Sequence, residues 1–397
     1  MNFDLTLEQQ AVVEAVRRAL RPLEPRREEI MRKVHRDKVF CQEVWDAFRD
    51  AGIFGSFLPE AYGGTGIGIT AMALAVEEAA KLGFGNAIAI LTCMDALCIL
   101  RNGSEELKRR FLPEVAAGKA RFCFALTEPD AGSNTFRITT RAARSADGGY
   151  EITGQKTYIT GADCAEWMLL VARTTSLEDA ERAGRGKSHG LSLFVVPTGA
   201  PGIEKRPIPT RGIEGMTQFT IFLDQVKVPA ANLVGEPDMG AMALFTSLNP
   251  ERILAAATAN GFIRFMIDRS CAYARERKVF KDRPIGAYQA IQHPLAECRI
   301  GLDASRLLTS RACWAFDREM DFATIGHYAN MAKFTAADLG VRTCDVAIET
   351  HGGNGFSEEY GIIYLWEAMR LLKTAPISRE MILNYTAEHV LELPRSY

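Results

Sequence analysis

The chain has 397 residues, of which 47% are hydrophobic and 24% are charged, and its formal net charge is −2. This composition is ordinary for a globular protein, and it provides no basic excess that would favour the binding of nucleic acid. No run of about 18 apolar residues is present, so we expect no membrane-spanning helix. The residues after Met1 lack the basic, apolar and small-residue pattern of a signal peptide.

The cysteines and histidines show no pattern of a bound metal. The nine cysteines are scattered without C-x-x-C spacing, and many of them lie in apolar runs. We therefore expect reduced core thiols in a cytoplasmic protein rather than disulfides. The six histidines also lack the spacing of metal ligands, so no metal site is predicted.

The first part of the chain is predicted to be helical. Thr6 can cap a helix over residues 5–20, with Gln9 as its reciprocal partner. Ser104 can cap a later helix, in which Pro113 predicts a kink or a break. Further helices are expected at residues 39–51, 70–82 and 84–101, with a glycine-rich loop at 59–66.

The pattern changes to β at Arg121, where alternation, β-branched residues and paired glycines begin. Residues 122–161 read as strand, turn, strand, turn, strand, with Asp147-Gly148-Gly149 as a hairpin signal. Further strands are predicted at 166–173, 191–197 and 218–228. Residues 174–190 are polar and glycine-bearing, so they are expected to form an exposed loop.

After Met239 the pattern is helical again almost to the end of the chain. Four long segments are expected to pack as an antiparallel bundle, at residues 239–275, 287–316, 324–350 and 358–390. The sequence therefore predicts an α+β fold with an N-terminal helical domain, a central β-sandwich or barrel-like domain and a C-terminal four-helix bundle. The expected boundaries are 1–121, 122–237 and 238–397.

Two neighbouring β segments could form a platform for a flat ligand. The turn Glu128-Pro129-Asp130-Ala131-Gly132-Ser133 follows Leu126-Thr127, and Gly132 allows a close approach to the backbone because it has no Cβ. Tyr158-Ile159-Thr160 ends another strand and adds a ring, a hydroxyl and backbone donors. The alternative is an ordinary hairpin with a core tyrosine.

Two later motifs lie at the ends of predicted helices. Arg277-Lys278-Val279-Phe280 either complements a helix dipole or clamps a diphosphate. Glu349-Thr350-His351-Gly352-Gly353-Asn354-Gly355-Phe356 has more glycines than a helix C-cap requires, so a ligand could pass close to its backbone.

Asn249-Pro250-Glu251-Arg252 places a carboxylate at the start of a helix or beside a kink in a longer one. The same helix face would carry small or apolar residues, namely Leu254, Ala255 and Thr258. A carboxylate on such a face is costly unless it is paired or used in chemistry. Glu251 is therefore an ion-pair partner of Arg252, a residue facing the helix dipole, or a functional carboxylate.

Taken together and in order, these motifs resemble those of the acyl-CoA dehydrogenase family. The resemblance covers essentially the whole chain, and it rests on Leu126-Thr127-Glu128-Pro129 with Ala131-Gly132-Ser133, Gly154-Gln155-Lys156 with Ile159-Thr160, Arg277-Lys278 with Phe280, and Gly352-Gly353-Asn354-Gly355-Phe356. It implies FAD as cofactor, an acyl-CoA substrate, and an electron-transfer flavoprotein or similar acceptor. It also implies a role in fatty acid metabolism and a homo-oligomer, dimer or tetramer, in which a neighbouring subunit completes the flavin site.

The resemblance further implies roles for individual residues. Those expected to line the flavin ring and ribityl chain are Phe124, Leu126, Thr127, Gly132, Ser133, Tyr158, Ile159 and Thr160. Those expected to contact other parts of FAD are Arg277, Phe280, Gln289 and Ser378, with Glu349 and Gly353 contributed by a neighbouring subunit. Those expected to contact the substrate are Ser133, Asn249 and Arg252.

The position of the catalytic base distinguishes this chain from the better-known members. Medium-chain-like members have a Glu after the glycine motif, in a segment where this chain has Ala375-Pro376-Ile377-Ser378. Isovaleryl- and long-chain-like members instead have a Glu before the helix Arg, as in Glu251-Arg252. The resemblance therefore implies that Glu251 removes the proton α to the thioester, while the β-hydrogen leaves as hydride to the flavin.

Alternatives of the same fold stay open at this point. The absence of a carboxylate at Ala375 is compatible with changed chemistry, as in acyl-CoA desulfinases or nitroalkane-oxidase-like flavoproteins. A non-enzymatic, DNA-associated flavoprotein is a further alternative, but that branch has a basic extension that this near-neutral sequence lacks.

Overall fold

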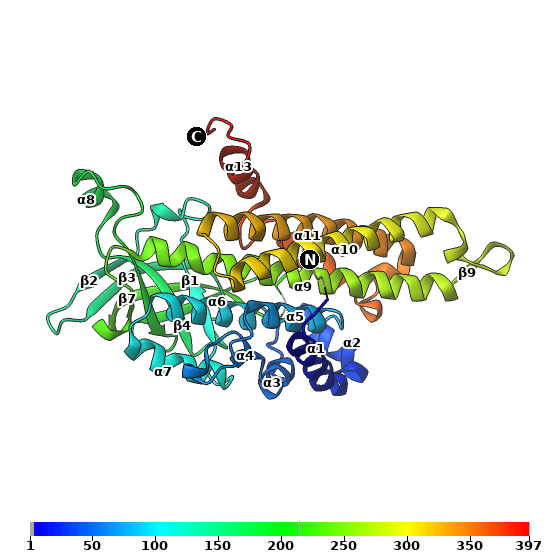
Figure 1. Cartoon of the computed structure of the whole chain (residues 1–397), viewed down its shortest axis with the longest axis horizontal. Coiled ribbons are helices and arrows are strands. Elements are labelled where there is room, and N and C mark those ends of the chain that lie inside the picture. Colours follow the sequence, from blue (N-terminus) through cyan, green and yellow to red (C-terminus); the bar gives the residue numbers. More distant parts are fainter. Residues whose placement is uncertain (1–3, 214, 397) are drawn as a thin grey trace.

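The computed structural model describes residues 4–213 and 215–396, which form helical, β-sheet and helical parts in chain order (Figure 1). The sheet lies at one end of an elongated molecule, and the small hairpin that contains β9 (Lys278–Val279) lies at the opposite end. Long helices connect the two ends. The predicted α+β fold class is therefore confirmed.

The first part contains α1 (Leu7–Leu20), α2 (Arg27–Met31), α3 (Gln42–Asp50), α4 (Ile53–Ser56), α5 (Ile69–Ala80), α6 (Ala87–Asn102) and α7 (Glu105–Ala116). The capping box is confirmed, because the Gln9 backbone N–H donates to Thr6 Oγ1 at 3.2 Å and the Thr6 N–H donates to Gln9 Oε1 at 3.0 Å. Of the predicted kink or break at Pro113, the break is wrong, since α7 continues through it to Ala116. Pro113 lies near the end of the helix, where one missing donor leaves the earlier turns intact.

The sheet part contains β1 (Phe122–Ala125), β2 (Arg141–Arg144), β3 (Tyr150–Thr160), β4 (Trp167–Arg173), α8 (Leu177–Arg182), β5 (Leu191–Pro197), β6 (Ile203–Ile208), β7 (Gln218–Val228) and β8 (Leu233–Val234). The strand order is β6-β7-β3-β2-β4-β5-β8, and β1 pairs with β4 in parallel. Residues Met168 to Ala172 of β4 are all buried, as expected for a strand covered on both faces.

Two details of the sheet part differ from the expectation. The exposed segment 174–190 includes the short helix α8, because Ser176 Oγ accepts a hydrogen bond from the Asp179 backbone N–H at 3.0 Å. Strand β6 was not predicted, since its sequence does not alternate and contains Pro207. β6 is an edge strand, and proline is tolerated at a sheet edge.

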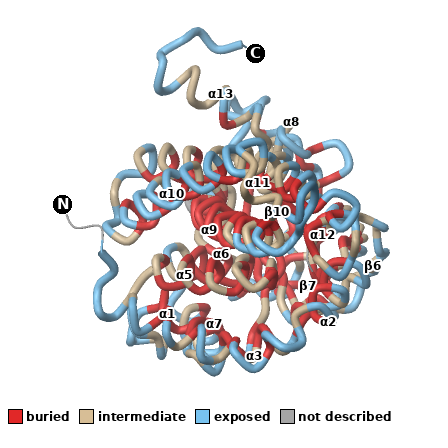
Figure 2. Tube along the Cα trace, turned by 90° about the vertical axis from the view of Figure 1, so that its right-hand side faces the viewer, coloured by how far each residue is buried: buried red, intermediate tan, exposed pale blue. Residues whose placement is uncertain are grey.

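The last part contains α9 (Gly240–Glu276), β9, β10 (Arg283–Pro284), α10 (Gln289–Asp317), α11 (Phe322–His351), α12 (Ile362–Leu371) and α13 (Arg379–His389). The prediction of one long helix over 358–390 is wrong. Pro376 disfavours a helical conformation at Ala375, so the chain turns there before Ser378 caps α13. Helix α13 projects from the body of the molecule (Figures 1 and 2).

Helix α9 lies at the centre of the fold, with α5 and α6 on one side and α10 and α11 on the other (Figure 2). It contacts α5 closely, because a Cβ on Gly261 would lie only 2.4 Å from the Glu77 carbonyl oxygen. α6 packs between α9 and β1, so it connects the helical core with the sheet.

A carboxylate joins the end of α10 to the beginning of α5. Asp317 accepts hydrogen bonds from the Ile69 backbone N–H at 2.7 Å, the Thr70 backbone N–H at 3.1 Å and the Thr70 hydroxyl at 2.5 Å. These are donors that the first turn of a helix leaves without a backbone partner. The start of an N-terminal helix is thus capped by a residue from the C-terminal part.

Candidate functional site

Glu251 lies on α9 one residue after Pro250, which the helix accommodates in its interior. The side chain is partly buried, and burial raises its pKa to about 7, although Arg252 and Lys333 act to lower it. No donor in the described part of the chain hydrogen-bonds to this carboxylate. Glu251 is therefore an unengaged carboxylate whose pKa suits general-base catalysis near neutral pH.

Of the alternatives for Glu251, an ion pair with Arg252 is absent among the described residues. Arg252 instead donates from Nη1 to Asn330 Oδ1 at 2.5 Å, from Nη2 to Asn249 Oδ1 at 2.8 Å and from Nε to the Leu248 carbonyl at 3.2 Å. Burial lowers its pKa to about 10, while Glu251 acts in the opposite direction. The guanidinium is hydrogen-bonded to these three oxygen atoms. Its charge therefore lowers the pKa of Glu251 without a hydrogen bond between the two side chains.

Lys333 of α11 is a second buried cation near Glu251, and sequence reasoning missed it. Its side chain is 2% exposed, and Nζ donates to the carbonyl oxygen of Ile377. Burial lowers its pKa to about 8, and the charge of Glu251 raises it. Lys333 therefore holds the backbone at Ile377 and affects the Glu251 carboxylate through its charge. A lysine within a small-residue helix was the sequence signal that could have identified it.

The β platform is held in place by a buried ion pair. Lys156 is fully buried, and its Nζ donates to Glu128 Oε1 and to the Leu126 carbonyl, both at 2.9 Å. Glu128 also accepts from the Thr139 and Thr140 backbone N–H groups at 2.7 and 3.0 Å. Because these bonds satisfy the buried charges, they fix the turn that follows Thr127.

Some of the predicted ring-binding residues are exposed on this platform, and others are buried beneath it. Tyr158 is 61% exposed and has a φ of 56°, a left-handed conformation that is uncommon for a non-glycine residue. Gly132 is exposed and a Cβ there would meet nothing within 4 Å. Leu126 and Ile159 are instead buried in the core, so their side chains support the platform.

Of the remaining platform residues, two are threonines whose oxygens accept hydrogen bonds, and two differ in how far they are exposed. The Thr127 carbonyl accepts from the Thr157 N–H at 2.9 Å, and Thr160 Oγ1 accepts from Gln218 Nε2 at 2.8 Å. Phe124 is partly buried, and Ser133 is exposed. The platform therefore offers an exposed ring, open glycine backbone and hydroxyl groups, a surface suited to a flat polar ligand.

A second group of predicted residues meets at a separate pocket of about 430 Å³. Arg277, Phe280, Glu349 and Gly353 line it together with aromatic residues that sequence reasoning did not assign, namely Tyr273, Tyr288 and His351. Phe280 is 82% exposed, and a Cβ on Gly353 would meet nothing within 4 Å. One cation, exposed rings and open glycine backbone suit a phosphate-bearing aromatic ligand.

Two predicted residues lie outside this pocket lining. Gln289 is exposed at the first position of α10, and Ser378 caps α13 by accepting from the Met381 N–H at 3.2 Å. The pocket lies beside β9, whereas the platform belongs to the sheet at the other end of the molecule (Figure 1). One chain therefore does not bring the two groups together.

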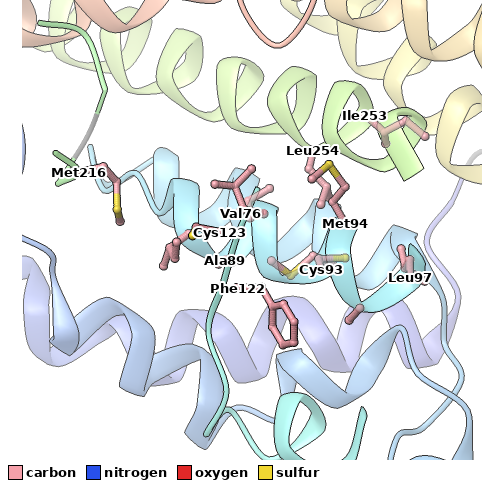
Figure 3. Close-up of a cluster of buried hydrophobic side chains, with 14 of the residues drawn as sticks. Val76, Ala89, Cys93, Met94, Leu97, Phe122, Cys123, Met216, Ile253 and Leu254 are labelled. Carbon is pink, nitrogen blue, oxygen red and sulfur yellow. The ribbon is translucent and has the colours of Figure 1, made fainter. Parts of the chain in front are cut away.

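The side of α6 that packs against α9 is apolar. Figure 3 shows a cluster of buried apolar side chains there, with Met94 and Leu97 from α6 and Ile253 and Leu254 from α9. The raised pKa of Glu251 has burial as its main cause, because a buried carboxylate loses its hydration. No helix in the described ranges is both long and apolar enough to cross a membrane.

Comparisons with known proteins cover most of the chain, including all three parts of the fold. Three family models match in order: acyl-CoA dehydrogenase N-terminal domain at residues 6–119, middle domain at 123–226 and C-terminal domain at 238–391. Acyl-CoA dehydrogenase FadE12 of Mycobacterium tuberculosis (strain ATCC 25618 / H37Rv) is 42% identical over 356 residues, which are 89% of each chain.

Solved structures agree with the sequence comparisons. Butyryl-CoA dehydrogenase from Megasphaera elsdenii has a TM-score of 0.89 and 28% identity, covering 98% of this chain and 100% of that one. A glutaryl-coenzyme A dehydrogenase in complex with glutaryl-CoA has a TM-score of 0.89 and 29% identity, covering 100% of this chain and 98% of that one.

Proposed function

The chain belongs to the acyl-CoA dehydrogenase family, and on this premise we propose that Glu251 is the base that removes the α-proton of a bound acyl-CoA. The protein is an FAD-dependent oxidoreductase that catalyses α,β-dehydrogenation of an acyl-CoA thioester. The observation that carries the assignment of the base is the free, partly buried Glu251 carboxylate with a pKa of about 7.

The residues present fit FAD. The platform offers the exposed Tyr158 ring and the open backbone at Gly132, and the pocket beside β9 offers Arg277 with open backbone at Gly353. A ring-binding surface and a cationic, aromatic pocket are what a flavin and an adenosine diphosphate require. When bound, FAD supplies the acceptor for the β-hydrogen of the substrate.

The chain's own residues prepare the proton transfer. Glu251 accepts the α-proton at a carboxylate oxygen, and its raised pKa makes it a stronger base than a solvent-exposed glutamate. Arg252 and Asn249, joined by a hydrogen bond of 2.8 Å, lie beside it and are the expected contacts for the CoA end of the substrate. Arg252 and then Lys333 limit the rise of the Glu251 pKa, so that a fraction of the carboxylate is ionised near neutral pH.

The placement of the two groups supports a homo-oligomer. The platform and the pocket beside β9 lie at opposite ends of one chain, so one FAD molecule cannot contact both within a single subunit (Figure 1). We infer that this pocket, with Glu349 and Gly353 and with the Arg277 and Phe280 that line it beside them, completes the flavin site of a neighbouring subunit.

Other expectations stay predictions. These are the domain boundaries 1–121, 122–237 and 238–397, the roles of Gln289 and Ser378 at FAD, a cytoplasmic location, a role in fatty acid metabolism, and an electron-transfer flavoprotein as acceptor. The last is testable by reoxidation of substrate-reduced protein with candidate acceptors.

The proposed function is tested by anaerobic mixing of the FAD-loaded protein with acyl-CoA of varied chain length and branching. The wild type is expected to lose its flavin absorbance with at least one substrate. Glu251→Gln is expected to retain FAD and to react about 10²–10⁴-fold more slowly, which is the usual contribution of a general base. Glu181→Gln on exposed α8 is the matched control. Unchanged reduction in Glu251→Gln would remove Glu251 from the mechanism.

A further inference from the structure

Arg173, the last residue of β4, is 2% exposed, and no carboxylate in the described part of the chain forms an ion pair with it. Its guanidinium donates only to backbone carbonyls. Nη2 and Nε donate to Phe136 at 2.6 Å and to Ile138 at 2.9 Å, in the segment after the platform turn. Nη1 and Nη2 donate to His189 at 2.9 Å and to Lys187 at 3.2 Å, in the loop before β5. The protein therefore buries a positive charge here without a direct counter-ion, which is costly.

The hydrogen bonds of Arg173 bring three further cations to one place on the surface. Arg137 belongs to the segment after the platform turn, and Arg185 and Lys187 belong to the loop before β5. The two segments are adjacent, because one nitrogen of Arg173 donates to the carbonyls of both Phe136 and Lys187. Arg137, Arg185 and Lys187 are exposed, and their side chains form no hydrogen bond or ion pair with other described residues. We call these three residues the cation cluster.

The other arginine of the loop is already engaged within its own helix. Arg182 of α8 forms an ion pair with Asp179 at 2.9 Å and a second one with Glu178. Its charge is therefore balanced by the chain itself. The cation cluster has no such balance, so it is available to a ligand with negative charge.

The cation cluster lies beside the platform, at the sheet end of α9. Arg137 follows Ser133 of the platform turn by four residues. The ring of Phe136 packs against the ring of Phe245 on α9, with 5.5 Å between the ring centroids. Phe245 precedes Glu251 by six residues, which is about 9 Å along a helix. A ligand bound at Glu251 and extended toward the sheet would therefore end near the cation cluster.

The substrate of an acyl-CoA dehydrogenase carries its negative charges at the end remote from the thioester, in a diphosphate and a 3′-phosphate. Arginine and lysine are the usual partners of phosphate groups. Arg252 offers no free donor for them, since three oxygen atoms of the chain already hold its guanidinium.

We propose that Arg137, Arg185 and Lys187 bind the phosphate groups of CoA, and that they make the protein selective for CoA thioesters over thioesters that lack the nucleotide. This inference rests on the proposed function, because it takes Glu251 to mark the position of the acyl group. The buried charge of Arg173 adds to the attraction, and its hydrogen bonds hold the two segments of the site together.

An acidic protein domain is the other kind of partner that a group of cations could attract. The cation cluster adjoins α8, because the Arg185 N–H donates to the Ala180 carbonyl at 2.8 Å. α8 projects from the sheet end of the molecule and carries three carboxylates but only one arginine (Figure 1). A broad acidic surface would meet these carboxylates, whereas a small phosphate-bearing ligand can contact the cations alone. The arrangement favours CoA.

The test compares two substrates on FAD-loaded proteins. One is an acyl-CoA that reduces the flavin, and the other is the S-acyl-pantetheine with the same acyl group, which lacks the phosphates and the nucleotide. The proteins are the wild type, Arg137→Ala, the double variant Arg185→Ala/Lys187→Ala, and the matched control Arg182→Ala. The readout is the ratio of kcat/KM for acyl-CoA over acyl-pantetheine, which a merely structural role of the loop would leave unchanged.

The double variant is expected to lower this ratio by about tenfold, chiefly through a higher KM for acyl-CoA, since it removes two charge-assisted contacts. Arg137→Ala is expected to lower it less, and Arg182→Ala to match the wild type. The KM for acyl-CoA is expected to depend less on salt in the double variant. Calorimetry with adenosine 3′,5′-bisphosphate is expected to show a similar loss of affinity without any acyl group.

The outcomes separate this inference from the function on which it rests. The same ratio in the double variant and the wild type would overturn the phosphate contacts alone. A wild type that prefers an acyl carrier protein to acyl-CoA, and loses this preference in the double variant, would assign the cation cluster to an acidic protein instead. Flavin that no acyl-CoA reduces would overturn the proposed function, while binding of the bisphosphate that depends on the cation cluster would still support the phosphate contacts.

Discussion

Replacing Glu251 by glutamine is expected to stabilise the protein while it slows proton abstraction. Burial raises the pKa of Glu251 from 4.5 to about 7, so the folded state holds a proton that the unfolded state has released between these values. The wild type therefore loses stability as the pH rises from about 4.5 to about 7. Each pKa unit corresponds to about 1.4 kcal/mol, which gives a loss of about 3 kcal/mol at pH 8.

Glutamine carries no charge, so Glu251→Gln does not undergo this loss. The variant is expected to gain about 3 kcal/mol relative to the wild type at pH 8, and less than about 1 kcal/mol at pH 5. Urea unfolding of the FAD-loaded proteins at the two pH values, followed by tryptophan fluorescence, measures the difference. The exposed Glu181→Gln is the control and is expected to show no such pH dependence.

The difference between the two pH values is the quantity that tests the reasoning. A constant effect of glutamine on packing would contribute equally at pH 5 and pH 8. A stability gap between variant and wild type that is the same at both pH values would show that Glu251 has an ordinary pKa in the folded protein. It would thereby remove the electrostatic basis for a strong base at this position.

Three other changes test neighbouring parts of the site. Lys333→Met is expected to move the midpoint of the pH profile of flavin reduction above about 7, because Lys333 acts to lower the pKa of Glu251; single-turnover reduction between pH 6 and 9 measures it, and an unmoved midpoint argues against the effect. Lys156→Met is expected to cost about 3–5 kcal/mol in urea unfolding, because it leaves the Glu128 carboxylate buried and unpaired, and adding Glu128→Gln is expected to restore part of the loss. Gly353→Val is expected to retain the stability of the FAD-free protein but to lose FAD on gel filtration, since its Cβ meets no atom of its own chain; Gly355→Ala, whose Cβ would lie 2.6 Å from the Ile348 carbonyl oxygen, is expected to destabilise the fold instead.

The order of helical and β parts was predictable because the hydrophobic period changes sharply at Arg121 and again after Met239. The sequence also indicated that Glu251 is an unusual carboxylate, since its small and apolar helix neighbours are visible there; its role as the base was implied by the resemblance and stays a proposal. The break before α13 was marked by Pro376 but was overlooked within an otherwise helical pattern.

Other features depend on packing between segments that are distant in the sequence. Lys333 is exceptional because the packing of α11 buries it near Glu251, and no local pattern reports which helix packs beside which. The separation of Thr127 and Tyr158 from Arg277 and Gly353 has the same origin. Residues of one motif set can belong to two sites when an elongated chain places them at opposite ends.

The Asp317 cap on α5 affects how cooperatively the protein unfolds. If the N-terminal helices detached while α10 stayed folded, Asp317 would lose all three of its donors from Ile69 and Thr70. The first turn of α5 would lose its acceptor in the same event. Partial opening would therefore cost free energy at Asp317 and at the start of α5. The two helical regions should consequently melt as one cooperative unit, and scanning calorimetry of the FAD-free protein would then record a single heat-absorption peak for them.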